Sequence, residues 1–217
     1  MPRWVWAGGG LVVLAVVAAM AFAIFEPIQV LPRLRLAPGF SLDAADDGRL
    51  TSEDGRGVVT LYGFSPLECG DDATCNAAAE VRRTMADAAT SMAAVDFGDT
   101  EVHLVIVALD APAPADLPAD GPVTWLTGDV DELRTVVGSG FEVFYETDDA
   151  GAVTRFDPRY VLVDGNGVVR GDYRYETLTS TADKVADHAE ILAEEIRYAA
   201  GATALAYEAA HLFLCYP

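Results

Sequence analysis

The stretch from Val58 to Met85, VVTLYGFSPLECGDDATCNAAAEVRRTM, decides the fold of this chain. It opens with the near-continuous apolar run 58–62, which is typical of a strand buried on both faces of a parallel or mixed sheet. The residues that follow predict a helix packed against that sheet, because apolar side chains recur along one helical face at Val81, Met85, Ala88 and Met92. Cys69 and Cys75 therefore fall in the loop and the first helical turn between the strand and the helix.

The position of these cysteines bears on their reactivity. We expect the helix to begin near Thr74, which places Cys75 in its first turn and Cys69 in the loop before it. Backbone N–H groups and the positive end of the helix dipole favour a thiolate there. Asp71 and Asp72 oppose this effect with two negative charges. We therefore predict thiol pKa values near the ordinary one and slow disulfide exchange.

Strands and helices alternate along the rest of the chain, which predicts βαβ units. A second buried strand is expected at 101–109, and His103 near its start is interpreted as a structural residue. The residues 164–167, Asp-Gly-Asn-Gly, predict a hairpin turn. The remaining elements are expected as a short strand at 123–126, a helix near 129–137, a further segment at 141–145, strands at 160–163 and 168–173, and a helix at 182–198.

The central stretch resembles the redox-active corner of the thioredoxin superfamily. The residues that carry this resemblance are Tyr62-Gly63-Phe64, the two-cysteine loop and the long helix, preceded by the Phe-Ser-Leu strand at 40–42. The chain is most similar to the membrane-anchored Sco/SenC proteins, which serve copper delivery to cytochrome c oxidase, over roughly residues 36–192. The resemblance implies an α/β, thioredoxin-like fold with a central mixed sheet flanked by helices.

The resemblance also implies a site. Cys69 and Cys75 would cycle between dithiol and disulfide, or hold copper(I), beside Pro158. Pro158 stands nine residues before Gly167, the offset found in related thiol-reducing proteins. A proline at this place is often cis and packs against the cysteines. The alternative is a trans proline that merely starts a strand.

Two departures from the Sco pattern bear on copper. The Sco copper site includes a histidine two residues before the proline, where this chain has Phe156, and five residues rather than three separate Cys69 from Cys75. Two thiolates can bind copper(I) alone, but the family's copper site cannot be carried over. Two functions stay open: a thiol-disulfide or copper-handling assembly factor for a respiratory oxidase, and a structural subunit with a static disulfide and no copper.

The N-terminus predicts a membrane anchor. No charge interrupts the 22 residues from Trp4 to Phe25, which suffice to cross a hydrocarbon core of about 30 Å. A cleaved signal peptide is the alternative, because small residues near Ala21 offer cleavage sites. We expect a transmembrane helix within 1–27, a linker at 28–38, the thioredoxin-like domain at 39–198 on the extracytoplasmic side, and a helical tail at 199–217.

Charge restricts the partners. The chain carries a net charge of −20, from 34 acidic and 14 basic side chains. This composition argues against nucleic acid, whose phosphates require a basic surface, and against adhesion to anionic headgroups. The excess of acidic side chains is explained by solubility. The alternative is a basic partner, such as a cytochrome with a lysine-rich face or an oxidase subunit.

The tail holds a third cysteine. Glu208, His211 and Cys215 recur on one helical face at a spacing that can present a metal pair, and a buried tail without metal is the alternative. His188, on the polar side of the preceding helix, is expected to be solvated.

Overall fold

The computed structural model describes residues 8–14, 16–17, 28–45, 48–119, 121–174, 181–199 and 202–213. Its strands are β1 Arg35–Leu36, β2 Ser41–Ala44, β3 Arg49–Thr51, β4 Val59–Ser65, β5 Val102–Ala108, β6 Thr124–Thr127, β7 Tyr145–Thr147, β8 Val153–Phe156, β9 Arg159–Val163 and β10 Val168–Arg174. Its longer helices are α2 Asp72–Met92, α4 Ala182–Arg197 and α5 Ala202–Phe213. Shorter helical pieces are η1 Pro114–Asp116, α3 Val130–Leu133 and the π-helix η2 Arg134–Gly140.

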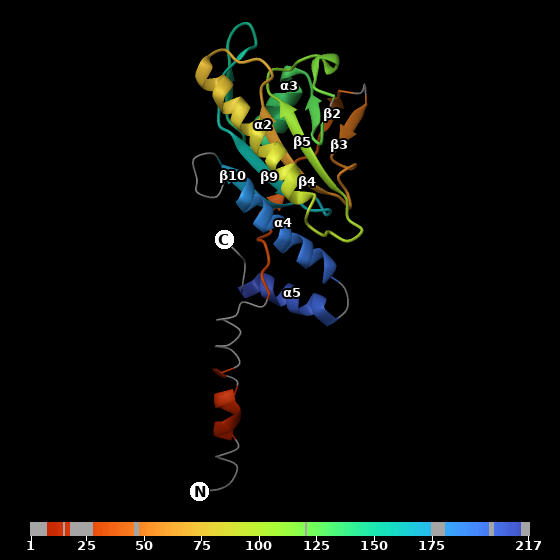
Figure 1. Ribbon diagram of the computed structural model, residues 1–217, viewed down its shortest axis with the longest axis vertical. Coiled ribbons are helices and arrows are strands. Elements are labelled where there is room, and N and C mark those ends of the chain that lie inside the picture. Colours follow the sequence, from red (N-terminus) through yellow and green to blue (C-terminus); the bar gives the residue numbers. More distant parts are fainter. Residues whose placement is uncertain are drawn as a thin grey trace.

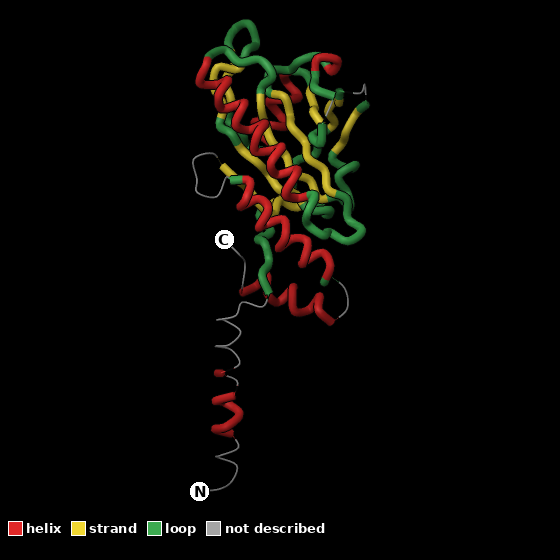
Figure 2. Tube along the Cα trace, viewed as in Figure 1, coloured by secondary structure: helices red, strands yellow, loops and turns green. Residues whose placement is uncertain are grey.

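Eight strands form one mixed sheet in the order β1-β10-β9-β4-β5-β6-β2-β3. β4, β5 and β6 run parallel, whereas β9 pairs with β4 in the antiparallel direction. α2 and α4 lie side by side over the same face of this sheet (Figures 1 and 2). The expected α/β fold with a central mixed sheet flanked by helices is confirmed.

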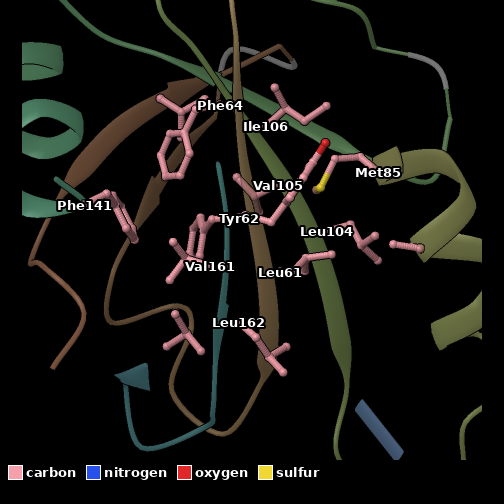
Figure 3. Packing of buried hydrophobic residues seen from close by; sticks show 14 of the residues in the cluster. Leu61, Tyr62, Phe64, Met85, Leu104, Val105, Ile106, Phe141, Val161 and Leu162 are labelled. Atoms are coloured by element: carbon pink, nitrogen blue, oxygen red, sulfur yellow. The ribbon is translucent and has the colours of Figure 1, made fainter. Parts of the chain in front are cut away.

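β4 lies at the centre of the core. Its side chains point alternately to the two faces of the sheet, and both faces are covered. Figure 3 shows Met85 of α2 on one side of β4 and Phe141 on the other. Tyr62 and Phe64 both contact the ring of Phe141, with ring centroids 5.1 Å apart in each pair. Gly63 faces α2, and a Cβ atom there would lie 2.9 Å from Sδ of Met85. The glycine therefore lets α2 approach the sheet closely.

The turn between β9 and β10 forms as the sequence predicted. Asp164 accepts hydrogen bonds from the backbone N–H groups of Asn166 and Val168, at 2.9 and 3.1 Å. Gly167 has φ of +76°, a conformation that favours glycine. This Asx-type turn fixes the register of the hairpin.

His188 corrects an expectation. Its side chain was expected in solvent, but the residue, which belongs to α4, is only 7% exposed and contacts Tyr173 of β10. The ring Nδ1 lies 2.8 Å from the hydroxyl of Tyr173. Burial lowers the pKa of His188 to about 4, so the imidazole is neutral at neutral pH. The buried face of α4 therefore includes His188, which the sequence pattern assigns to the polar side of the helix.

The expected anchor and linker precede the sheet, and the expected tail follows α4. Residues 1–7, 15 and 18–27 of the expected anchor lie outside the described residues, and no helix in the described part is both long and apolar enough to cross a bilayer. Residues 28–38, expected as a linker, contact the domain: Val30 and Leu31 are fully buried, and β1 pairs with β10. The expected helical tail is present as α5.

Candidate redox site

Cys69 and Cys75 form a disulfide, with their Cα atoms 5.4 Å apart. Cys75 lies exposed in the first turn of α2, whereas Cys69 is half-buried in the loop that leaves β4. The sequence predicted this division between loop and helix correctly. The disulfide is thus accessible to a reagent or partner from the side of Cys75.

Neighbouring segments fix the loop that carries Cys69. The carboxylate of Asp110, just after β5, accepts hydrogen bonds from the backbone N–H groups of Leu67 and Glu68 at 3.0 and 2.7 Å. Gly70 donates its N–H to the carbonyl of Val153 at 2.9 Å, next to a bridge between Cys69 and Val153. These bonds join the cysteine loop to β8, a strand about 80 residues later in the sequence.

Asp71 caps the helix that carries Cys75. α2 begins at Asp72, two residues earlier than expected, and the Asp71 carboxylate accepts the N–H of Thr74 at 2.7 Å. Hydrogen bonds from the backbone and side chain of Thr74 hold the pKa of Asp71 below its usual value. A carboxylate therefore already occupies the positive end of the helix dipole. The near-ordinary pKa values of the two thiols stay a prediction.

Phe156 and Pro158 lie close to this corner on β8 and the loop that follows it. Phe156 is 6% exposed and pairs with Tyr145 of β7. Pro158 is buried and directly precedes β9. The expectation of a cis proline is wrong, because no described peptide bond is cis. Phe156, Pro158 and Ala77 of α2 share the wall of a cavity of about 500 Å³, and neither cysteine lines it.

The donor set does not fit the copper site that the resemblance implies. Phe156 supplies an apolar ring where a nitrogen ligand would stand. The described histidines lie elsewhere: His103 is 3.5 Å from Glu101, His188 contacts Tyr173, and His211 is 2.9 Å from Glu195. Within the described ranges no cluster of three or more histidine, cysteine or acidic side chains is arranged to hold a metal.

The expected metal pair of the tail is not assembled among the described residues, and Cys215 lies outside them. Glu208 pairs with Arg33 at 2.6 Å instead. His211 contacts Glu195 of α4, which belongs to a buried ion cluster around Arg170 that the sequence analysis missed. The only local signal for this cluster is an arginine within the otherwise apolar start of β10.

Neither the protein-family models nor the curated proteins compared with the chain give a match. Solved structures do match. BsSco, a member of the Sco family of cytochrome c oxidase assembly proteins in which a disulfide switch was identified, gives a TM-score of 0.58 at 17% identity, over 76% of this chain and 97% of that chain. This chain has the fold of the Sco proteins.

Two further structures agree with this Sco-type fold. ScoI of Arabidopsis thaliana with copper bound gives a TM-score of 0.56 at 18% identity, over 75% of this chain and 98% of that chain. A SCO1/SenC family lipoprotein of Bacillus anthracis gives 0.55 at 17% identity, over 73% and 95%. About a quarter of this chain thus has no counterpart in these structures.

The charge on Asp71 is expected to hold the Cys75 thiol near its reference pKa of about 8.5 in the reduced protein. Asp71→Asn keeps a good helix cap but removes the charge, so we expect a lower thiol pKa and faster alkylation at neutral pH. Alkylation rates against pH, measured in a Cys69→Ser, Cys215→Ser background, test this. A Cys75 thiol that titrates below about 6.5 with Asp71 intact would contradict the expectation.

Proposed function

We propose that the chain is a membrane-anchored member of the Sco/SenC family and that Cys69 and Cys75 exchange disulfides with a specific protein partner during assembly of a respiratory oxidase. The observation that carries the proposal is the accessible disulfide at the strand-to-helix corner of a Sco-type fold. The apolar run near the N-terminus supports the anchor and an extracytoplasmic domain.

The exchange follows from the exposure of the two cysteines. A partner thiolate attacks Sγ of exposed Cys75, forms a mixed disulfide and releases Cys69 as a thiolate. A second partner thiol then displaces Cys75, which leaves the dithiol form here and a disulfide on the partner. The reverse sequence oxidises the chain. From the resemblance to the Sco proteins, we expect Pro158 to border the approach of the partner.

The second part of this proposal is that the reduced chain handles copper(I). Sco structures with copper bound support it at the level of the fold. Phe156 removes the nitrogen donor, so we expect only weak binding by the two thiolates of the reduced chain.

A static disulfide is the second candidate function, and a specific observation favours it. Asp71 and Asp72 place negative charge beside Cys75, and the loop of Cys69 is fixed by Asp110 and Val153. Such a site would exchange slowly and serve as a structural cross-link in a subunit without copper.

The reduction potential of the disulfide decides between the two. Glutathione buffers of graded potential are expected to give a midpoint between about −270 and −120 mV, the range of exchange proteins. Thiol counts in denaturant calibrate the measurement: one reactive thiol, Cys215, before reduction and three after it. A midpoint below about −300 mV would favour the static disulfide, and three thiols before reduction would contradict both functions.

A further inference from the structure

α5 differs from the other long helices in having few ionisable residues, each of which has a partner. Its 12 residues include only two acidic or basic side chains, Glu208 and His211. Glu208 pairs with Arg33, and His211 contacts Glu195. Tyr207 and Ala210 pack on Val30 in a small cluster separate from the main core. α5 is therefore held from one side by the segment that leads from the N-terminus.

The exposed side of α5 is mainly apolar, with Glu208, the partner of Arg33, at its edge. Leu205 is 77% exposed, and Ala206 and Ala209 are exposed beside it. Tyr198, at the end of α4, stacks on Tyr207 with ring centroids 6.0 Å apart and therefore belongs to the packed side of α5, not to the side of Leu205.

Charge sets this end of the domain apart. The whole chain carries −20, whereas residues 28–36 and 194–213 together hold equal numbers of arginine and glutamate: Arg33, Arg35 and Arg197 with Glu194, Glu195 and Glu208. Glu195 is buried against Arg170, and Arg197 also pairs with Asp96, so the surface at this end is close to neutral, which limits repulsion by an anionic lipid surface. In Figure 1 this surface lies at the lower end of the domain, on the side of residues 8–17.

Chain length limits how far α5 can lie from a membrane. Val30 is five residues beyond Phe25, where the apolar run ends. Five extended residues reach at most about 18 Å. The headgroup layer adds about 5–8 Å on each side of the hydrocarbon core, and a helix is about 10–12 Å wide. A helix packed on Val30 is thus within reach of the headgroups.

We propose that α5 lies on the bilayer surface as an interfacial helix, with Leu205 and its exposed alanine neighbours in the boundary between headgroups and acyl chains. This inference rests on the anchor included in the proposed function. Together with the anchor, α5 would fix the orientation of the domain, because two contacts remove the rotation that one flexible connection permits. Thiol exchange at Cys69 and Cys75 plays no part in the argument.

Tryptophan quenching in the full chain tests the position of α5. Leu205→Trp and, on the same exposed side, Ala209→Trp are placed in phosphatidylcholine vesicles whose acyl chains are brominated. Val130→Trp is the matched control, because Val130 is 49% exposed on α3, at the other end of the domain. The emission of the unsubstituted chain is subtracted. We expect bromine to reduce the added emission at positions 205 and 209 at least about twofold and to leave that at 130 unchanged.

The other outcomes overturn the inference in distinguishable ways. If the chain floats with vesicles but aqueous acrylamide quenches Leu205→Trp and Ala209→Trp as strongly as the control, α5 is in water and the anchor stands. If these two variants resist both quenchers, another protein surface or a second copy covers α5. If the chain does not float with vesicles, both the anchor and the interfacial helix are wrong. The redox midpoint of the disulfide tests the proposed exchange separately.

Discussion

Replacing Phe156 with histidine is expected to raise the copper(I) affinity of the reduced chain by at least about tenfold, because it restores a third donor beside two thiolates. The resemblance to the Sco proteins implies this placement. Phe156 ends β8, the strand that bridges to Cys69 through Val153, and it is buried rather than turned into solvent. Loss of its ring from the core would lower stability, so the variant must first show a cooperative unfolding transition.

Competition against a copper(I) chelator of known affinity measures this effect. Val130→His adds an imidazole at an exposed site on α3 and serves as the control, since it should leave affinity unchanged. Cys75→Ser in the Phe156→His background should abolish the gain, because it removes one thiolate. Equal affinity for the parent and Phe156→His would show that position 156 does not face the cysteines.

Replacing Arg170 with methionine is expected to lower the free energy of unfolding by about 3–5 kcal/mol, because it leaves buried carboxylates without their counter-charge. Arg170 is 3% exposed and lies 3.0 Å from Asp164 and 2.6 Å from Glu195. It also donates to the carbonyls of Leu31 and Pro32, at 2.8 and 3.2 Å. One guanidinium thus joins β10, the β9–β10 turn, α4 and the segment before β1.

Arg33→Met is the matched control for Arg170→Met. Its ion pair with Glu208 is equally short, at 2.6 Å, but the two side chains are 48% and 62% exposed. Solvent screens such a pair, so the loss should not exceed about 1 kcal/mol. Urea unfolding of the full chain in a mild detergent gives both values. Similar losses for the two variants would mean that the buried cluster contributes no more than a surface pair.

The sequence was sufficient for the features that depend on local periodicity. β4, α2 and the position of Cys69 in the loop and Cys75 in the first turn followed from an apolar run and a helical stripe, since both patterns repeat within a few residues. The Asp164 turn was predicted for the same reason, because an Asx residue and two glycines act on their own backbone. The resemblance to Sco proteins then led to the fold, which the solved structures confirm.

Only the tertiary structure decided which distant groups meet. Arg170 has partners 139 and 25 residues away, and no local pattern selects them. His188 is on the side of α4 that reads as polar, yet Tyr173 of β10 covers it. Asp71 was counted as a charge near the cysteines, but its role as helix cap depends on where the loop ends against β8. Periodicity shows which face of an element is buried, whereas packing between elements determines which residue each polar group contacts.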